Sequence, residues 1–220
     1  MVVSQVCFND KKNMLANRAT VVLRQFFQRR YVASRWFLGK NGERLVTIND
    51  VHIVAETQRL RRLADSDAGF YRQMLNDPDF IHFMVDRRID SDAAALAEMQ
   101  VGVYASYQKH GFGMYRVDMA EAGQPVGMAG LVRRDFFDGP DLGYAFLPAG
   151  RGQGLATEAG AAVLQHVRDD LRLAAVTAQE NTASIRVLQR LGFLDAGMLV
   201  WTDTGETCAL FDCDLSTVVG

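Results

Sequence analysis

The sequence predicts an α+β protein in which a mixed, mainly antiparallel sheet is flanked by helices. Three observations lead to this prediction. Short segments with the two-residue period of strands are separated by hairpin-length turns in the middle of the chain. Segments with the apolar period of helices lie before and after them. A glycine-dense loop joins one strand directly to a helix, and the resulting order, β-α-α-β-β-β-α-β-α-β-β, suits an α+β sandwich.

The elements are expected at regular intervals along residues 53–215. In chain order they are a strand at 53–63, helices at 65–75 and 91–110, strands at 114–119, 126–133 and 142–147, a helix at 155–167, a strand at 173–178, a helix at 181–191, and strands at 199–202 and 207–215. The first strand is irregular. Asp65 or Ser66 can cap the first helix, and Asp77-Pro78 is expected to end it because the residue before a proline avoids helical backbone angles.

Turn signals separate the later elements. Ser91 can cap the second helix, and Gly111 follows its last residues, as glycine does at many helix ends. Residues 121–125, Glu-Ala-Gly-Gln-Pro, have the length and composition of a hairpin turn, so the strands on either side are expected to pair antiparallel. After the glycine-dense loop, apolar residues recur on one face of a helix from Leu155 to Val167.

The composition is that of a globular protein, with 49% apolar and 23% charged residues among 220. Polar or charged residues interrupt every apolar run well before the roughly 20 positions that a membrane-spanning helix requires, so no span is expected. Cys7, Cys208 and Cys213 make an odd number, and the last two lie in one expected strand at a spacing that points them to opposite faces. The sequence therefore favours a reducing, cytoplasmic location.

Charge divides the chain near Val51. Residues 1–50 carry nine Lys and Arg against three Asp and Glu, whereas the remaining residues carry 15 against 23. This shift predicts a basic N-terminal extension at 1–50 and a separate domain at 51–220. Within the extension, apolar residues recur at helical spacing and predict an amphipathic basic helix: Leu15, Ala19, Val22, Leu23, Phe26 and Phe27.

Three roles for this extension remain open at the level of sequence. It has the Arg-rich, amphipathic character of an organelle transit segment, although the early Asp10 and the scarcity of serine weaken that interpretation. It can also be a helix that docks on the acidic domain, or an extension without a selected role. Its basic residues lack the interleaved motifs of nucleic-acid or membrane-surface binders, so neither partner is expected.

The segment 142–159 carries the clearest chemical signal. Pro148 stops a strand, and a glycine-dense loop, Arg151-Gly-Gln-Gly154, opens a helix. Such a loop leaves unpaired backbone N–H groups at the positive end of the helix dipole, and glycine lets a phosphate approach the backbone closely. The loop therefore predicts an anion site, the alternative being a turn that merely connects the strand to the helix.

The sequence distinguishes among three kinds of phosphate-binding loop. A nucleotide P-loop requires a lysine after its last glycine, but no lysine occurs after Lys109. The dinucleotide fingerprint requires a third glycine or alanine where this chain has Thr157, and no series of βαβ units surrounds the loop. These mismatches leave coenzyme A as the expected ligand.

Two motifs resemble those of the GNAT N-acetyltransferases. Residues 151–156, Arg-Gly-Gln-Gly-Leu-Ala, are similar to the family's R/Q-x-x-G-x-G/A signature. Residues 181–193, with Asn first, Ser184 fourth and Gly-Phe last, are similar to the helix that lines the cofactor arm in that family. The similarity spans about residues 53–215. With Ser184 and the Ala-Thr-Glu-Ala that follows the loop, it is most like the ribosomal-protein N-terminal acetyltransferase branch.

This resemblance implies a fold and a set of site residues. The fold is a GNAT-like sheet with a splayed strand before the pyrophosphate loop. Backbone groups of Phe146 and Leu147 are implied to hold the acetyl carbonyl and the pantetheine amides, Asn181 to bond the pantetheine arm, and Ser184 to lie near the sulfur. The pyrophosphate is implied to rest on the loop and the first helical turn: Arg151, Gly152, Gln153, Gly154, Leu155, Ala156 and Thr157.

One departure from the family concerns the acid that protonates the leaving thiolate. Many members carry a tyrosine seven residues after the Asn, where this chain has Leu188. Ser184 and Tyr144 are the expected catalytic substitutes, although a thiolate, with a pKa of about 8 to 9, can leave without full protonation. The base has three candidates, each with an equally good structural explanation: Asp141, Glu158 and His110.

The sequence thus predicts an N-acetyltransferase that transfers acetyl from acetyl-CoA to a primary amine, on a protein N-terminus or a small molecule, by direct attack in a ternary complex. The alternative is a non-catalytic acyl-CoA-binding regulatory module, which Leu188 favours. The expected partners are acetyl-CoA and an amine acceptor, with the protein a monomer or a homodimer. No metal is expected, because the four histidines lack ligand spacing and a cysteine partner: His52, His82, His110 and His166.

Overall fold

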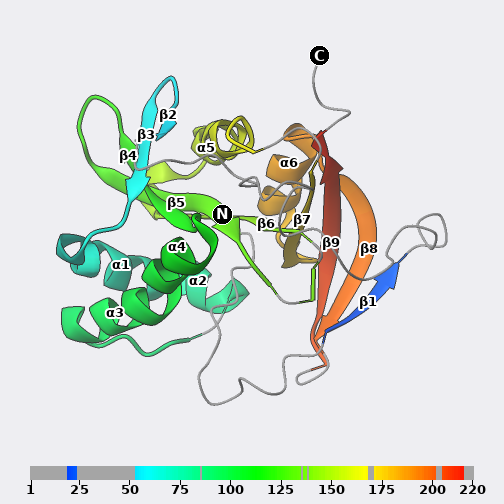
Figure 1. Ribbon diagram of the computed structural model, residues 1–220, viewed down its shortest axis with the longest axis horizontal. Coiled ribbons are helices and arrows are strands. Elements are labelled where there is room, and N and C mark those ends of the chain that lie inside the picture. Colours follow the sequence, from blue (N-terminus) through cyan, green and yellow to red (C-terminus); the bar gives the residue numbers. More distant parts are fainter. Residues whose placement is uncertain are drawn as a thin grey trace.

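A nine-stranded sheet runs through the protein in the order β1-β8-β9-β7-β6-β5-β4-β3-β2 (Figure 1). The computed structural model describes residues 19–23, 53–84, 86–134, 136–137, 139–167, 171–201 and 205–215, with the backbone alone at 19–23. The strands are Ala19–Leu23 (β1), Ile53–Val54 (β2), Gln58–Arg62 (β3), Met114–Met119 (β4), Pro125–Val132 (β5), Asp141–Phe146 (β6), Arg172–Ala178 (β7), Leu194–Trp201 (β8) and Thr207–Asp214 (β9). Neighbouring strands pair antiparallel except β6 and β7, which confirms the mixed, mainly antiparallel sheet predicted from the sequence.

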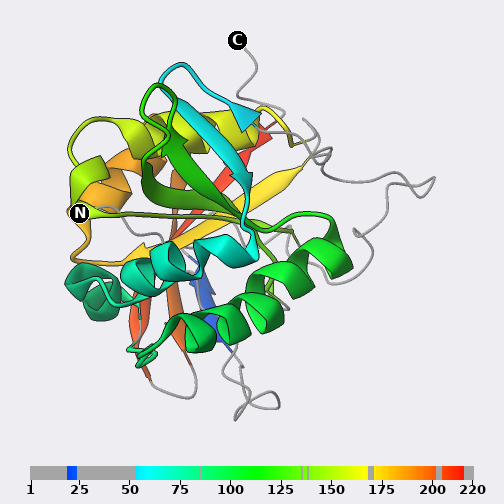
Figure 2. The same cartoon turned by 90° about the vertical axis from the view of Figure 1, so that its left-hand side faces the viewer.

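Helices cover both faces of this sheet. They are Ala68–Leu75 (α1), Pro78–Phe83 (α2), Asp92–Met99 (α3), Ala105–His110 (α4), Leu155–Leu164 (α5) and Thr182–Arg190 (α6), with shorter helical turns at Asp65–Asp67 (η2), Gln100–Tyr104 (η3) and Pro148–Gly150 (η4). Figure 2 shows α1, α3 and α4 on one face and α5 on the other. Among the described residues, no helix combines the length and apolarity that crossing a membrane requires.

The central strand β6 separates two apolar cores. Leu142, Tyr144 and Phe146 pack with α5 and α6, whereas Ala145 and Leu147 pack with α1 to α4. This division follows from the alternation of side chains along a strand. All five side chains are buried, so the backbone of β6 lies at the centre of the molecule.

A third core lies on the other half of the sheet, where β7, β8 and β9 bury residues such as Val176 and Leu199. Cys208 belongs to this core, while Cys213 belongs to the core beneath α5 and α6. Both thiols are free and buried. The prediction that these two cysteines point to opposite faces is therefore confirmed.

Two expected elements in the first half of the domain differ in detail. The single strand expected at 53–63 is a hairpin of β2 and β3, because the chain turns back at 55–57. Asp77-Pro78 follows the end of α1 as expected, but it also begins α2. Asp77 caps α2 by accepting two backbone hydrogen bonds, and Pro78 occupies the first turn, where its missing N–H has no helical partner to lose.

Strand β8 begins earlier than the 199–202 segment predicts. Its register with β9 shifts between Asp195 and Gly197, where the Asp195 carboxylate accepts a hydrogen bond from the Gly197 N–H at 2.8 Å. A bulge of this kind places an extra residue in one strand and breaks the two-residue alternation. The periodicity that predicts a strand is therefore interrupted over the first half of β8.

The amphipathic helix expected over residues 15–27 is wrong where the structure describes that segment. Ala19–Leu23 forms β1, which pairs antiparallel with β8 from Trp201 to Gly197. Its sequence, Ala-Thr-Val-Val-Leu, suits a strand, and the open edge of β8 offers backbone hydrogen bonds. Other expectations about the N-terminal half lie outside the described residues: the remainder of that helix, Cys7, Val51 and His52.

Candidate active site

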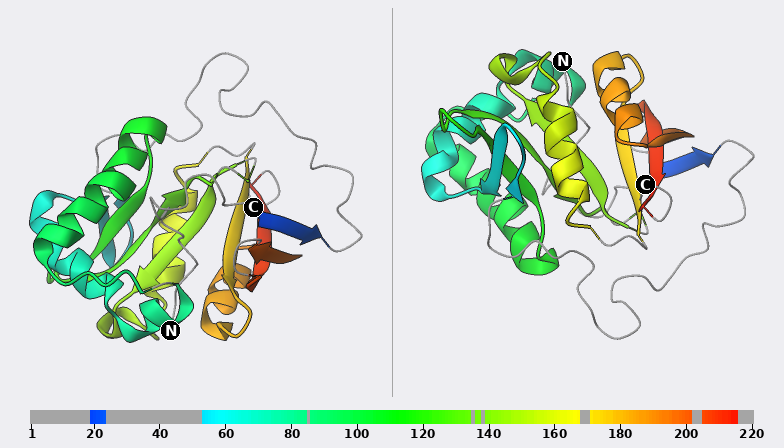
Figure 3. Two further views of the ribbon diagram at one scale, coloured as in Figure 1. Left: turned by 90° about the horizontal axis from the view of Figure 1, so that it is seen from below. Right: turned by 90° about the horizontal axis from the view of Figure 1, so that it is seen from above.

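The two central strands meet at a single residue pair. β6 and β7 pair in parallel at Asp141 and Ala174, and no further pair joins them among the described residues. Figure 3 shows the two strands close together at one end and apart at the other. The splayed strand expected before the glycine loop is therefore confirmed.

Hydrogen-bond alternation decides which backbone groups of β6 face the region where the strands separate. Successive residues of an antiparallel strand direct their N–H groups alternately to one side and to the other. The Leu147 N–H donates to the Val126 carbonyl of β5 at 2.9 Å, so the N–H groups of Tyr144 and Phe146 point toward β7. No described residue accepts a hydrogen bond from the Phe146 N–H. This group is an unpaired donor at the end of a buried strand.

The glycine loop that follows β6 has backbone angles that only glycine adopts readily. Gly152 has a φ of +75° and Gly154 a φ of +81°, both in the left-handed region. A Cβ added at either glycine has no heavy atom within 4 Å, so the space above the loop is open. The Gly154 carbonyl accepts the N–H groups of Thr157 and Glu158 at 2.9 and 3.1 Å, which starts α5.

The first turn of α5 leaves donors for an incoming anion. The N–H groups of Leu155 and Ala156 precede the first N–H that bonds within the helix, and no described residue accepts from them. The Thr157 hydroxyl, in the same turn, is buried without a hydrogen-bond partner. These donors beside two open glycines match what a pyrophosphate requires, so the residues present fit the cofactor that the motifs imply.

Arg151 enters the site through its side chain and not, as expected, through its N–H group. That N–H donates to the Pro148 carbonyl at 3.2 Å within the loop. The guanidinium donates from Nε to the Phe146 carbonyl at 2.7 Å and forms ion pairs with Asp77 and, at 2.7 Å, with Asp79. Arg151 thereby ties the loop to the end of β6 and to the start of α2.

The two hydroxyls expected to act on the leaving thiolate come together in the structure. Tyr144 lies on β6 and Ser184 on α6, and their hydroxyl oxygens are 3.0 Å apart. The Tyr144 hydroxyl also lies 3.1 Å from the Ser184 carbonyl, so its one proton can go to either Ser184 oxygen. Both side chains are fully buried, and burial raises the pKa of Tyr144 despite the hydrogen bond with Ser184. When Tyr144 donates to the Ser184 hydroxyl, Ser184 keeps its own proton for a ligand, whereas the Tyr144 proton is used within the pair.

Asn181 sets the start of α6. Its side-chain oxygen accepts the Ser184 N–H at 3.1 Å, which is the usual contact of a capping residue. Leu188 is fully buried in the core beneath α5 and α6 and carries no proton to donate. The structure thus gives Asn181 a capping role, and its contact with the pantetheine arm stays a prediction.

Glu158, a candidate base, is held by the turn between β2 and β3. Its two carboxylate oxygens accept hydrogen bonds from the N–H and the hydroxyl of Thr57, at 2.7 and 2.6 Å. Burial would raise the pKa of Glu158, but hydrogen bonds from Thr57 and Gln58 outweigh it and hold the pKa below its usual value. A carboxylate with a lowered pKa and both oxygens occupied is a weak base.

The other two candidate bases lie at the opposite end of the sheet from Phe146. Asp141 is at the paired end of β6, fully buried and 3.1 Å from Arg134; burial raises its pKa to about 6 although nearby arginines oppose the shift. His110 ends α4 beside the start of β4, which lies across β5 from that same end of β6. The structure therefore brings neither group to the region where β6 and β7 separate.

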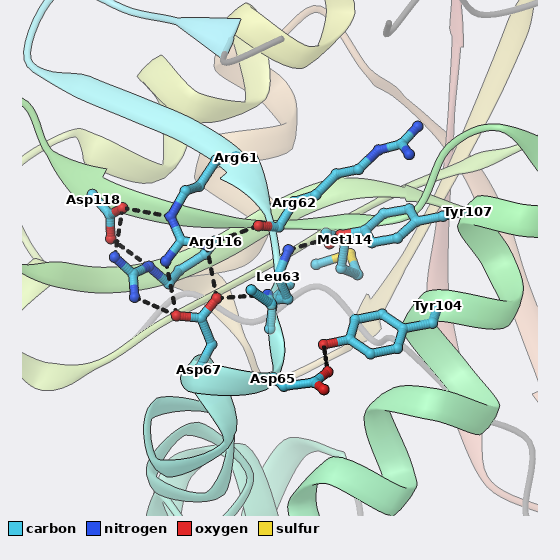
Figure 4. Close-up of polar contacts among 11 residues, drawn as sticks. Arg61, Arg62, Leu63, Asp65, Asp67, Tyr104, Tyr107, Met114, Arg116 and Asp118 are labelled. Atoms are coloured by element: carbon cyan, nitrogen blue, oxygen red, sulfur yellow. Dashed lines mark hydrogen bonds and ion pairs between the residues drawn. The ribbon is translucent and has the colours of Figure 1, made fainter. Parts of the chain in front are cut away.

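A second cluster of charged side chains joins β3 and β4 to the start of α1 (Figure 4). Arg61 and Arg116 both bind Asp67, at 2.8 and 2.6 Å, and Asp118 contacts the same two arginines. Burial would raise the pKa of Asp67, but the hydrogen bond from Arg61 and the charge of Arg116 lower it overall. Two cations balance two anions, so this cluster acts as a structural tie between the strands and the helix.

Sequence reasoning missed Asp77, Asp79 and Thr57 as residues that shape this site. The pair Asp77-Pro78 is a typical helix start as well as a helix end, so a signal for its capping role was present. Its partner is not visible in the sequence, because Arg151 lies 72 residues from Asp79. Thr57 has no local signal, since its bond to Glu158 spans 101 residues.

Comparison with known proteins agrees with this geometry. A family profile described as an acetyltransferase (GNAT) domain matches residues 58–194. The acetyltransferase from Agrobacterium tumefaciens is similar in structure, with 21% identity, coverage of 78% of this chain and 99% of that chain, and a TM-score of 0.62. RimL, a ribosomal L7/L12 alpha-N-protein acetyltransferase in complex with coenzyme A, has 16% identity, coverage of 74% and 98%, and a TM-score of 0.63.

A third structure, the microcin C7 self-immunity acetyltransferase MccE in complex with acetyl-CoA and AMP, has 13% identity, coverage of 78% and 99%, and a TM-score of 0.62. At such identities these structures show a shared fold. The family profile matches more than half of this chain, and the matched residues include both the glycine loop and helix α6, which Asn181 caps. The chain therefore belongs to the GNAT acetyltransferase family.

Proposed function

We propose that this protein transfers an acetyl group from acetyl-CoA to a primary amine, by direct attack of the amine in a ternary complex. The observation that carries the proposal is the unpaired Phe146 N–H, which lies where β6 and β7 separate and just before the glycine loop. A donor suited to a carbonyl oxygen and donors suited to phosphates thus follow one another along the chain.

The proposed cofactor contacts follow from the directions of these donors. The Phe146 N–H bonds the acetyl carbonyl oxygen, and the Tyr144 N–H and Asn181 bond the pantetheine arm. Leu147 has no such role in this proposal, because its N–H bonds the Val126 carbonyl. The pyrophosphate rests on the N–H groups of the loop and on the first turn of α5: Gly152, Gln153, Gly154, Leu155, Ala156 and Thr157.

In this reaction the protein's own residues stabilise two negative charges, one on the carbonyl oxygen and one on the departing thiolate. The Phe146 N–H stabilises the negative charge that develops on the carbonyl oxygen when a neutral amine attacks. As the C–N bond forms and the C–S bond breaks, the Ser184 hydroxyl donates a hydrogen bond to the departing thiolate, and Tyr144 holds Ser184 in place by donating to the Ser184 hydroxyl. The nitrogen loses its extra proton to water or to a base. Acetyl-CoA supplies the acetyl group, and no covalent enzyme intermediate is required.

We propose protein N-termini as the first class of acceptor to test. Ser184 and the Ala-Thr-Glu-Ala after the loop resemble the ribosomal-protein N-terminal acetyltransferase branch, and acetyltransferases of ribosomal proteins, RimL among them, have a similar fold. Residues 51–220 carry 15 basic against 23 acidic residues, a balance that attracts cationic acceptors in general.

The second candidate function is a non-catalytic acyl-CoA-binding regulatory module, which Leu188 supports because it cannot act as an acid. Both candidates bind acetyl-CoA, but only the enzyme releases free thiol when an amine is present. The deciding measurement is thiol release with peptides that begin with Ser or Ala, with a polyamine and with an aminoglycoside. Release with any of them supports the enzyme, and binding without release on the whole panel supports the module.

We expect Gly154→Glu to weaken acetyl-CoA binding at least tenfold, about 1.4 kcal/mol, because it places an anion and a strained backbone where the pyrophosphate is proposed to lie. Gly123→Glu is the matched control. Gly123 has a φ of +63° and, like Gly154, open space around an added Cβ, but it lies in the turn after β4. Calorimetry that gives equal affinities for the folded Gly154→Glu and Gly123→Glu variants overturns the assignment of the loop.

We also propose a reducing, cytoplasmic location. Cys208 and Cys213 are free thiols in separate cores, which suits a compartment where cysteines stay reduced. Mass spectrometry of protein isolated under thiol-blocking conditions tests this, since both thiols are expected to be alkylated once the protein is unfolded.

A further inference from the structure

The guanidinium of Arg151 joins three points that are far apart in the sequence. It donates to the carbonyl of Phe146, the last residue of β6, and it pairs with Asp77 and Asp79 at the start of α2. The Arg151 and Asp77 side chains are 16% and 5% exposed, so their charge-assisted contact is largely shielded from water, whereas Asp79 is 43% exposed. The two ion pairs link the cofactor loop directly to α2.

Asp77 serves both α2 and Arg151 with the same atom. Its Oδ1 accepts the N–H groups of Asp79 and Phe80, both at 3.1 Å, and it also accepts the bond from Arg151. The Asp77 side chain is 5% exposed. Because one oxygen caps the helix and holds the arginine, the start of α2 and the position of Arg151 depend on each other.

The bond to Phe146 fixes the end of β6. Arg151 Nε bonds the carbonyl of the peptide that joins Phe146 to Leu147, and the N–H of that same peptide donates to the Val126 carbonyl at 2.9 Å. The peptide plane is therefore held from both sides. Its orientation sets the course of the backbone at Phe146, whose own N–H is the donor proposed for the acetyl carbonyl.

We propose that Arg151 is a positioning residue that couples α2 to the acetyl-CoA site. This inference rests on the proposed function. Acetyl-CoA that binds the Phe146 N–H and the glycine loop stabilises the Arg151 contacts, and those contacts stabilise the start of α2. Such coupling is reciprocal, so an ordered α2 in turn strengthens acetyl-CoA binding. Since α2 packs in the core on the face of β6 opposite α5 and α6, the coupling carries the state of the cofactor site across the sheet.

The chemistry of arginine explains why another cation does not replace it. A guanidinium is planar and presents donors in fixed directions, so it can serve a carbonyl and two carboxylates at once. A lysine ammonium carries the same charge but lacks this fork. Arg151→Lys is therefore expected to restore only part of the coupling that Arg151→Gln removes.

The test is hydrogen exchange of the full-length protein, read by mass spectrometry on peptides that cover residues 77–83, with and without saturating acetyl-CoA. In the wild type, acetyl-CoA is expected to slow exchange in this segment at least about fivefold, the lower end of usual coupling strengths. In Arg151→Gln the protein still binds acetyl-CoA, about fivefold more weakly or worse, and the slowing in 77–83 disappears.

Two further variants make the result specific. Asp79→Ala removes the Arg151–Asp79 ion pair and leaves Asp77 to cap α2. In the double variant Arg151→Gln/Asp79→Ala, acetyl-CoA binding is expected to be no weaker than in Arg151→Gln alone. Arg87→Gln is the matched control: the Arg87 side chain is 10% exposed and pairs with Glu98 of α3 at 3.2 Å. This control is expected to keep both the acetyl-CoA affinity and the slowing in 77–83.

The outcomes separate this inference from the proposed function. If calorimetry shows no acetyl-CoA binding by the wild type, the proposed function is overturned together with the coupling. If the wild type binds but exchange in 77–83 does not respond, or responds equally in Arg151→Gln, the coupling is overturned and the proposed function stands. Additive losses in Arg151→Gln/Asp79→Ala also overturn it.

Discussion

Ser184 and Tyr144 lie 40 residues apart in the sequence, yet their hydroxyls form one short chain inside the protein. The Tyr144 hydroxyl lies 3.0 Å from the Ser184 hydroxyl and 3.1 Å from the Ser184 carbonyl, and the Asn181 cap holds the backbone N–H of Ser184. A hydroxyl held on both sides loses little freedom when it donates to a departing group, which suits the role proposed for Ser184.

At this scale we expect Ser184→Ala to lower turnover by roughly 10² to 10⁴, the range typical of positioned proton donors, with little change in acetyl-CoA affinity. Tyr144→Phe removes a hydroxyl that only orients Ser184, so turnover is expected to fall about fivefold, the equivalent of about 1 kcal/mol. Steady-state kinetics of thiol release separates the two. If Tyr144→Phe abolishes turnover in a folded protein while Ser184→Ala leaves it intact, the donor is Tyr144.

The elements around the loop are held by contacts that run between distant parts of the chain. The first turn of α5 is tied to the β2–β3 hairpin by Glu158 through Thr57 and by the Gln58 side chain, which donates to the Leu155 carbonyl at 3.0 Å. These contacts fix the helix start whose free N–H groups are proposed to bind phosphate. Glu158, a candidate base by sequence, is therefore explained as a structural carboxylate.

At the scale of elements we expect Glu158→Gln to lower the free energy of unfolding by about 1 kcal/mol, a value that allows for its partial exposure. The pKa of Glu158 is lowered in the folded state, so its contribution is present above its unfolded pKa and is lost as the pH falls through the folded value. Urea denaturation at neutral pH measures the loss. Glu180→Gln, at an exposed turn, is the control, and equal midpoints for the two variants contradict the assignment.

At the scale of the whole molecule, the buried carboxyl of Asp141 acts against stability at neutral pH. Asp141 sits at the single pair that joins β6 to β7, and burial raises its pKa from 3.8 to about 6 in the folded state. The folded protein therefore binds this proton more tightly than the unfolded chain does. Its effect on stability is greatest at low pH and is lost as the pH rises through about 6.

We expect the free energy of unfolding to fall by up to about 3 kcal/mol between pH 4 and pH 6.5, and Asp141→Asn to flatten that dependence. Asp212, whose pKa burial also raises, adds to the same slope, whereas Asp67 and Glu158 act at lower pH because their pKa values are lowered. Urea denaturation across this range tests the prediction. A slope that is identical in the wild type and in Asp141→Asn removes Asp141 as its source.

The N-terminal extension meets the sheet at the end farthest from the hairpin. β1 pairs with β8, and β9 and β7 stand between β8 and β6. We therefore propose that residues 1–50 are dispensable for acetyl-CoA binding but protect an edge of the sheet, since an uncovered strand invites pairing with another chain.

We expect a chain that begins at Val51 to bind acetyl-CoA with the affinity of the full chain and to self-associate more strongly. Calorimetry and analytical ultracentrifugation measure these two properties. If the shortened chain is monomeric, β1 does not protect the edge. If it binds acetyl-CoA much more weakly, the boundary at Val51 is wrong and the extension belongs to the acetyltransferase domain.

Local patterns predicted most of the elements because their causes are local. The helix from Leu155 follows from apolar spacing, and the hairpin between β4 and β5 follows from a turn of five residues. The pattern failed where a distant partner or a bulge intervened. The alternation of β8 is interrupted near Gly197 by a bulge. Strand β1 depends on pairing with a partner about 180 residues away, and a local helical period cannot predict such pairing.

The sequence by itself determined the fold class, the GNAT family and the glycine loop, because strand alternation, helix period and glycine spacing are patterns of residues that are close together in the sequence. Only the tertiary structure decided that Phe146 and not Leu147 offers an N–H toward β7, since that depends on which neighbour each residue bonds. It also brought Arg151 to Asp77 and Asp79, and Tyr144 to Ser184. Hydrogen bonds act over about 3 Å in space, and the separation of two residues in the sequence places no limit on them.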